Sequence, residues 1–190
     1  MKRKLALKEL IEILVNEKNH NPHDSSFRII IDKYPKEAHD TYNFPGKYVK
    51  SLNKKVYTSD GRKLEMDHAA LIMPDGVITQ KSTVNVEHQS TRLNQDKIKT
   101  IYDYKIGLIH DTNLPPISFV ITKIKNENDD EYYYAYNNLF NIIVYVVKRD
   151  EIYERLNILR NKISNNEKLT IREALNFSFI ANFVDDDIGK

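Results

Sequence analysis

The sequence predicts a mixed α/β fold (class α+β), in which a central mixed sheet is flanked by helices. Apolar residues recur at helical spacing near both ends of the chain, whereas short runs rich in β-branched residues alternate with turn residues between 55 and 91. The chain of 190 residues is 41% hydrophobic and 29% charged, which is enough apolar material for one core. We expect one domain over 1–190, with an N-terminal helix in 1–22, a core in 23–125, and further strands and C-terminal helices in 126–190.

The N-terminal segment is predicted to be helical. Apolar residues three and four positions apart predict an amphipathic helix over 4–18. A second helix is expected to begin at Asp24 or Ser25, either of which suits an N-cap, and to stop near the Tyr34-Pro35 step. A short helical segment over 37–42 follows.

From residue 55 the pattern changes to that of strands. Runs at 56–58 and 64–73 are separated by Ser59-Asp60-Gly61, and Pro74-Asp75-Gly76 is a strong turn sequence. The chain returns through 77–79 and 83–91, with a bulge or loop at 80–82. These runs predict a meander of about three strands.

The second half of the chain returns to helices and strands in alternation. A helix over 93–109 should end before Pro115-Pro116, and a strand is expected at 117–124. The runs 132–136 and 142–147 predict strands, although the second also suits a buried helical turn. Helices over 150–163 and 170–183 close the chain, the second with Thr170 and Glu173 at capping-box spacing. Between about 24 and 124 the order is therefore αβββαβ.

Composition limits the chemistry that the chain offers. It has no cysteine, which excludes disulfides, thiolate zinc sites and cysteine nucleophiles, and it is compatible with the cytoplasm, where we expect the protein. No window is apolar enough to span a bilayer, and no membrane partner is expected. The net charge of +2 is unevenly distributed, because the first third of the chain is basic. Six of its residues precede the Asp67 strand and suit either a phosphate backbone or a solvated loop: Lys47, Lys50, Lys54, Lys55, Arg62 and Lys63.

Two carboxylates stand in neighbouring predicted strands, within Met66-Asp67-His68 and Val86-Glu87-His88-Gln89. Because side chains alternate along a strand, Glu87 and Gln89 project to one face, and the two histidines turn to the other. An Asp, a Glu and a strand carbonyl supply the hard oxygens that Mg²⁺ takes. A tight turn at 74–76 would instead pair Asp67 with a residue near 83, so the 80–82 bulge or a longer connection must absorb the offset.

These residues carry a family resemblance. Asp67, Glu87-His88-Gln89, a helix with Lys99 and Tyr102, and the run 116–120 together resemble the PD-(D/E)XK nuclease superfamily. Residues 23–27 and 159–175 resemble the opening motif and helical tail of its recombination-promoting nuclease and transposase-like branch. The resemblance implies a restriction-endonuclease-like αβββαβ core and Mg²⁺- or Mn²⁺-dependent hydrolysis of phosphodiester bonds in DNA, linked to mobile elements or recombination.

The resemblance also implies roles for individual residues. Asp67, Glu87 and the backbone carbonyl of His88 would bind the metal, and Gln89 stands where the family commonly has lysine. Since glutamine carries no charge, a lysine from elsewhere would have to reach the site. The candidates for that lysine are Lys81, Lys97 and Lys99, and those for an acid from the first helix are Asp24 and Glu37, with an N-cap as the other role of Asp24.

Two functions follow from this pattern. The first is a metal-dependent endonuclease that acts on DNA with Asp67, Glu87 and Gln89 as catalytic residues. The alternative is an inactive protein that keeps the nuclease fold and binds nucleic acid or a protein partner, which the glutamine at position 89 favours. A homodimer is open in either case.

Overall fold

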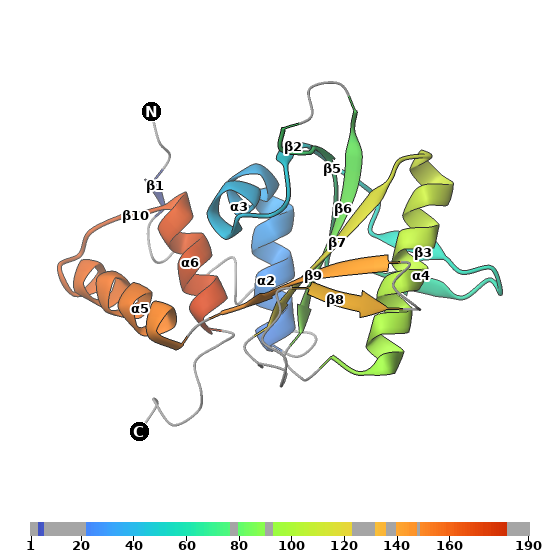
Figure 1. Ribbon diagram of the computed structural model, residues 1–190. Helices are drawn as coiled ribbons and strands as arrows, with labels where there is room; N and C mark the ends of the chain where they lie inside the picture. The colour runs from blue at the N-terminus through green and yellow to red at the C-terminus, as the bar shows by residue number, and fades with distance from the viewer. Residues whose placement is uncertain are drawn as a thin grey trace. The chain divides into compact units, whose positions relative to one another are not determined.

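The structure is a computed structural model, and it describes residues 4–5, 22–76, 80–89, 93–122, 132–135, 140–147 and 149–181. The chain divides into two compact units: Asn43–Val146 forms one, and Met1–Tyr42 with Val147–Lys190 forms the other. The described residues of the first unit form a six-stranded sheet, a two-stranded hairpin and one long helix, whereas those of the second are mostly helical (Figure 1). The expectation of a single domain stays a prediction.

The sheet of the first unit is mixed, with strand order β2-β5-β6-β7-β9-β8. The first three strands form an antiparallel meander, β7 lies parallel to both β6 and β9, and β8 closes the edge antiparallel to β9. This arrangement confirms the predicted mixed sheet, and β9 is a strand rather than a helical turn. The bounds are β2 Lys47–Ser51, β5 His68–Met73, β6 Ser82–Gln89, β7 Pro116–Thr122, β8 Tyr132–Ala135 and β9 Phe140–Val146.

Helix α4 (Gln95–Thr112) is the crossover between the parallel strands β6 and β7. Asn94 caps its first turn, because the Asn94 side chain accepts a hydrogen bond from the Lys97 N–H, and Asn113 ends it in the left-handed conformation. The apolar side of the helix packs into one cluster with residues of the sheet. This cluster contains Val56, Met66, Ala69, Leu93, Ile98, Ile101, Tyr104, Leu108, Val120, Ile142 and Val144.

A separate hairpin, β3 (Lys55–Tyr57) and β4 (Lys63–Glu65), is inserted between β2 and β5. Val56 is buried against α4 at Gly107, where an added Cβ would lie 2.5 Å from the Val56 Cβ. The Tyr104 hydroxyl of the same helix donates to the Glu65 carbonyl oxygen at 2.9 Å. The hairpin is therefore held on α4 by close packing and a hydrogen bond.

Two strand predictions were wrong in this region. The run 56–58 was placed in the main meander but belongs to the inserted hairpin, and the run 64–73 is two strands, β4 and β5. Residues 47–51 were not predicted as a strand, yet they form β2 at the sheet edge. Most of its side chains are exposed, so the strand lacks the apolar alternation that reveals a half-buried strand. The run 77–79 lies outside the described residues.

The described residues of the second unit include four helices: α2 Pro22–Lys33, α3 Pro35–Tyr42, α5 Arg149–Ser164 and α6 Ile171–Ala181. The capping box is confirmed, because the Thr170 N–H donates to Glu173 at 2.8 Å and the Glu173 N–H donates back to the Thr170 hydroxyl at 3.3 Å. The Tyr42 hydroxyl donates to the Leu175 carbonyl at 2.7 Å, which ties α3 to α6. Burial raises the pKa of Tyr42, so it stays a protonated donor.

Two expectations for the N-terminal segment differ from the structure. Helix α2 begins at Pro22, so Asp24 lies inside its first turn and not at the N-cap, because proline suits the first helical position. Lys4–Leu5, predicted as the start of a helix, instead forms strand β1, paired with β10 (Leu169–Thr170). The rest of the helix predicted over 4–18 lies outside the described residues.

The predicted fold class is confirmed: the chain is α+β with a central mixed sheet. Helices α2 and α3, strands β2, β5 and β6, helix α4 and strand β7 follow one another in the predicted αβββαβ order, interrupted by the inserted hairpin. Within the described part of the chain, no helix combines the length and apolar character needed to cross a membrane.

The contact between Val56 and Gly107 makes a stability prediction. Gly107→Ala should lower the free energy of unfolding by about 1–3 kcal/mol, because the new Cβ overlaps Val56 and the hairpin must shift. In a Val56→Gly background the same change should raise it by about 1 kcal/mol, since alanine is the better helix former. Urea unfolding of the four proteins measures both effects, and a change of the same sign in the two backgrounds would contradict the close contact.

Candidate functional site

Strands β5 and β6 bring Asp67 and Glu87 together. His68 pairs with Val86 in the antiparallel ladder, so Asp67, one position earlier, stands across from Glu87. The first pair beyond the turn is Ile72 with Ser82, and the connection is therefore much longer than a turn at 74–76. This longer connection absorbs the expected offset and sets both carboxylates on the same face of the sheet.

Reciprocal hydrogen bonds join the two acids. The Asp67 N–H donates to Glu87 Oε1 at 3.1 Å, and the His88 N–H donates to Asp67 Oδ2 at 2.7 Å. Asp67 is 5% exposed and Glu87 is 1% exposed. Each carboxylate is thus oriented by a backbone amide of the other strand, so the pair depends on the strand register rather than on flexible side-chain contacts.

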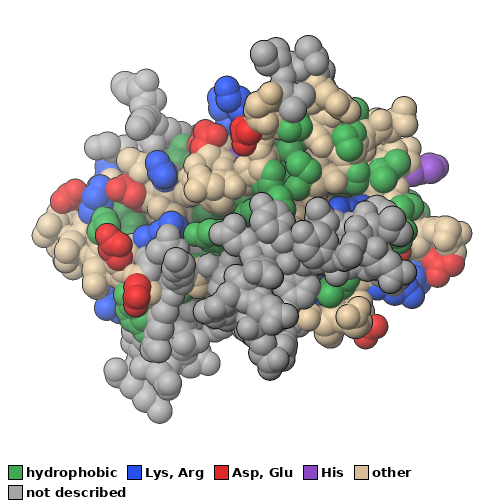
Figure 2. Space-filling view, in the orientation of Figure 1, with side chains coloured by type: hydrophobic (Ala, Val, Ile, Leu, Met, Phe, Trp, Pro, Cys, Tyr) green, Lys and Arg blue, Asp and Glu red, His purple; other side chains and the backbone are tan. Residues whose placement is uncertain are grey.

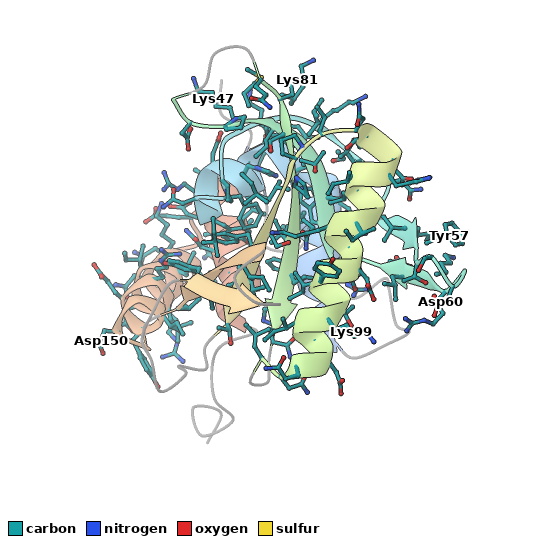
Figure 3. The ribbon with its side chains drawn as sticks, turned by 45° about the vertical axis from the view of Figure 1, so that its right-hand side comes forward. Lys47, Tyr57, Asp60, Lys81, Lys99 and Asp150 are labelled. Carbon is teal, nitrogen blue, oxygen red and sulfur yellow. The ribbon has the colours of Figure 1, made fainter. Side chains whose placement is uncertain are left out.

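Lys97 completes the group. Its ammonium nitrogen lies 2.7 Å from Glu87 Oε2, and its side chain is 25% exposed. The Asn94 side chain accepts a hydrogen bond from the Lys97 N–H at 2.8 Å, which places Lys97 in the first turn of α4. Of the three lysines considered from the sequence, Lys97 makes this contact, whereas Lys81 and Lys99 are exposed (Figure 3).

The electrostatics of the group are dominated by burial. Burial and the neighbouring Asp67 raise the pKa of Glu87 to about 7, although Lys97 and the Asp67 N–H oppose the rise. Two buried carboxylates and one ammonium therefore lie together, and these three groups carry one more negative than positive charge when all are ionised. Such an excess favours either a proton or a bound cation beside the two acids.

The oxygen donors suit a hard divalent cation. Asp67 and Glu87 offer adjacent carboxylates, and the strand carbonyl at His88 follows Glu87 in sequence. Among the residues that the structure describes, no three Asp, Glu, His or Cys side chains gather into a metal cluster. The remaining ligands of an ion here would be a backbone carbonyl and water, which Mg²⁺ commonly retains.

Gln89 and the two histidines flank the acids. Gln89 ends β6 on the same face as Glu87 and is half-buried. His68 and His88 alternate to the opposite face and are both buried. The His68 ring packs near Phe44, with ring centroids 6.5 Å apart, which is the packing role that alternation predicts.

The six basic residues do not form one row. Lys47 and Lys50 lie on edge strand β2, and Lys47 pairs with Met73, at the end of β5 away from Asp67. The other four belong to the inserted hairpin or its base, and Arg62 is bound to Asp60 at 2.8 Å. The residues in β2 and β3–β4 lie in strands rather than in a loop, their side chains are exposed, and a role in binding phosphates stays a prediction. Among the described side chains of Figure 2, basic and acidic groups are interspersed.

The remaining candidates and the residues that sequence reasoning missed can be placed as well. Asp24 and Glu37 lie in α2 and α3 of the helical unit, and a role as helix acid stays a prediction. Asn94, which was missed, positions Lys97, and an Asn directly before a helical pattern is the signal that would have found it. Buried Ser118 donates to Asn85 at 2.6 Å and links β7 to β6 two residues before Glu87.

Comparisons with known proteins give little. The sequence matches no family model, and no curated protein matches it. Among solved structures, this chain is similar to the small subunit of the heterodimeric restriction endonuclease R.BspD6I. The two share 10% sequence identity and a TM-score of 0.33 over 94% of this chain and 100% of that chain. This likeness is weak and supports no argument about the site.

The raised pKa of Glu87 predicts a pH-dependent stability difference. A carboxyl pKa that rises from its ordinary 4.5 to about 7 on folding contributes stability below about pH 4.5, and this is lost as the pH rises through 7. Glu87→Gln mimics the neutral form. Without divalent metal it should therefore be more stable than the natural protein at pH 8, by on the order of 1–3 kcal/mol, with little difference at pH 4.5.

Urea unfolding in a chelating buffer across this pH range measures the difference. Glu65→Gln, at an exposed position, is the matched control and should leave stability within about 0.5 kcal/mol of the natural protein. The stability difference is the free energy of unfolding of Glu87→Gln minus that of the natural protein. A difference that is smaller at pH 8 than at pH 4.5 would contradict the raised pKa of Glu87.

Proposed function

We propose that this protein is a Mg²⁺- or Mn²⁺-dependent nuclease of the PD-(D/E)XK type that hydrolyses phosphodiester bonds in DNA. The observation that supports the proposal most directly is the buried pair Asp67 and Glu87, joined by reciprocal backbone hydrogen bonds and contacted by Lys97. Burying two adjacent carboxylates is costly for a fold, and a structural role would be met more cheaply by apolar side chains. Such a pair is characteristic of a functional site.

The residues have separate roles in this proposal. Asp67, Glu87 and the His88 carbonyl hold the metal, which when bound stabilises charge on the phosphate and lowers the pKa of a water molecule. Backbone amides fix the orientation of both acids before metal arrives. Gln89, on the same face as Glu87, orients water through its amide group.

Lys97 supplies the positive charge that Gln89 lacks. Its ammonium is anchored on Glu87 Oε2 and is partly exposed, so it reaches from the buried acids toward solvent, where a phosphate would arrive. The lysine comes from the first turn of α4 and not from β6. Because the positive charge comes from α4, position 89 on β6 does not need to carry it and can hold the neutral glutamine.

The alternative is a protein that keeps the fold and binds nucleic acid or a protein partner without cleavage. The ion pair between Lys97 and Glu87 favours it, because that ammonium occupies an oxygen that a metal would otherwise take. This alternative predicts salt-sensitive DNA binding with no turnover in Mg²⁺ or Mn²⁺.

Plasmid nicking separates the two functions. The purified protein should nick supercoiled DNA in Mg²⁺ or Mn²⁺ and not in a chelator, and Asp67→Asn should abolish the reaction because a metal ligand is lost. Lys97→Met should reduce the rate by on the order of 100-fold, the usual effect of removing one group that stabilises transition-state charge. Lys99→Met, on an exposed position of the same helix, is the matched control and should be unaffected. Equal nicking by Asp67→Asn would point to a contaminating nuclease and sink the proposal.

Metal binding can be tested without activity. Mn²⁺ should raise the thermal midpoint of the natural protein in a concentration-dependent manner, because a ligand that binds only the folded state stabilises it. Asp67→Asn should lose this shift, and Lys99→Met should keep it. An equal shift in Asp67→Asn would show that Mn²⁺ binds elsewhere.

A further inference from the structure

The inserted hairpin presents an aromatic ring to solvent. Tyr57 is 67% exposed, more than any other large hydrophobic side chain among the described residues, and Figure 3 shows it on the outer side of the molecule, away from α4. A single exposed apolar residue is ordinary on a protein surface. What distinguishes Tyr57 is its surroundings, which combine rigidity, positive charge and a short path to the candidate site.

Lysines flank the ring on the same face of the hairpin. Val56 and Leu64 pair with each other and turn inward, so Lys55, Tyr57, Lys63 and Glu65 turn outward. Tyr57 pairs directly with Lys63, and opposed residues in such a ladder have Cβ atoms about 5 Å apart. Lys55 lies two positions along the same strand and is exposed. Lys63 therefore lies across from the ring and Lys55 follows it along the strand, with Glu65 across from Lys55.

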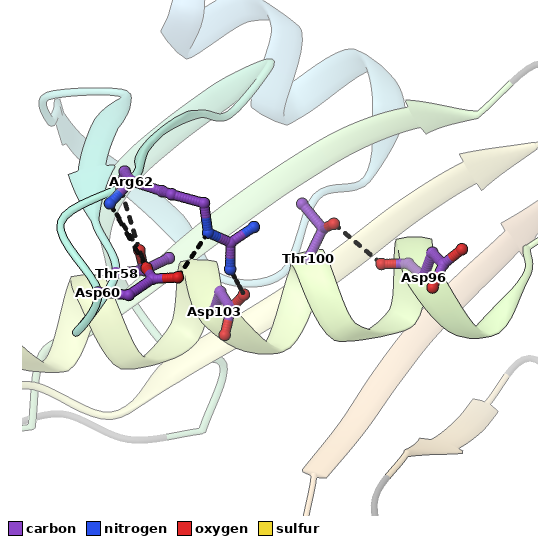
Figure 4. Close-up of polar contacts among 6 residues, drawn as sticks. All are labelled: Thr58, Asp60, Arg62, Asp96, Thr100 and Asp103. Atoms are coloured by element: carbon purple, nitrogen blue, oxygen red, sulfur yellow. Dashed lines mark hydrogen bonds and ion pairs between the residues drawn. The ribbon is translucent and has the colours of Figure 1, made fainter.

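The hairpin holds this face rigidly. At the tip, the Arg62 side chain binds Asp60 at 2.8 Å and reaches Asp103 of α4 at 4.0 Å, while Thr58 also binds Asp60 (Figure 4). Below the tip, Val56 packs on Gly107. Because these contacts fix the strand before a ligand arrives, little conformational entropy is lost when the ring is covered.

The hairpin lies close along the chain to the two carboxylates. At the base of the hairpin the Met66 N–H donates to the Lys54 carbonyl oxygen at 2.9 Å, and Asp67 is the next residue. Lys63, the partner of Tyr57, precedes Asp67 by four positions, which corresponds to at most about 14 Å of extended chain. A nucleic-acid strand on the hairpin is thus within a few nucleotides of the acids.

We propose that the outer face of the hairpin, formed by Lys55, Tyr57 and Lys63, binds single-stranded nucleic acid. The Tyr57 ring stacks on one unpaired base, and the two lysines contact the phosphates on either side. In a duplex both faces of each base are already covered by neighbouring bases, so a protein ring gains the stacking contact only where the strand is unpaired. The inference rests on the proposed function and narrows its substrate to DNA with unpaired nucleotides beside the cleaved bond.

Binding in a chelating buffer tests the inference without cleavage. A fluorescein-labelled oligothymidine should bind more tightly than a blunt duplex of the same length when measured by anisotropy. Tyr57→Ala should weaken binding of the single strand by roughly tenfold or more, and Tyr57→Phe, which keeps the ring, should bind within about twofold of the natural protein. Val49→Ala, an exposed residue on edge strand β2, is the matched control and should bind normally.

Charge and contact are tested separately. Lys55→Gln and Lys63→Gln should each weaken binding and reduce its dependence on salt. An oligonucleotide carrying 5-iodouracil, irradiated in the complex, should crosslink to Tyr57 as located by mass spectrometry. Unchanged binding by Tyr57→Ala, equal affinity for the duplex, or crosslinks confined to other residues would overturn the inference.

These outcomes are distinguishable from failure of the proposed function. Binding that depends on Tyr57, with no plasmid nicking in any metal, would support the hairpin interface and refute the nuclease activity. Nicking that requires Asp67 but does not depend on Tyr57, together with binding that does not prefer single strands, would support the nuclease activity and refute the hairpin interface. Thermal unfolding of each variant confirms that a loss of binding is not a loss of fold.

Discussion

The antiparallel register between β5 and β6 is the constraint on which the site depends. Both carboxylates are oriented by backbone amides of the opposite strand, so their positions are set by the ladder itself. A slip of one residue would turn Glu87 to the other face of the sheet and separate the acids. The long connection between Met73 and Ser82 matters for the same reason, because it permits a register that a tight turn would forbid.

Helix α4 links the site to the rest of its unit. Its first turn carries Lys97 to the acids, and its central residues Tyr104 and Gly107 hold the inserted hairpin. One rigid element therefore positions both the charge beside the carboxylates and the surface that we infer to meet the substrate. The cluster of apolar side chains between this helix and the sheet holds the helix in place, and with it both Lys97 and the hairpin.

Stability and chemistry are opposed at Glu87. Burial beside Asp67 raises its pKa toward neutrality, which means that the ionised form is unfavourable in the folded chain. Lys97 offsets part of that cost, and a divalent cation would offset more. A fold that keeps two such acids has retained an arrangement that packing alone does not favour.

Local patterns in the sequence determined much of this protein: the α+β class, the end of α4 before Pro115, the capping box at Thr170, and the presence of Asp67 and Glu87 on neighbouring strands. Each of these depends on residues close together in the chain. Tertiary structure alone decided the strand identity of Lys47–Ser51, the length of the β5–β6 connection, and the choice of Lys97 over the exposed Lys99. Those features depend on sheet position and helix phase, which are fixed by contacts between distant segments and leave no pattern in the local sequence.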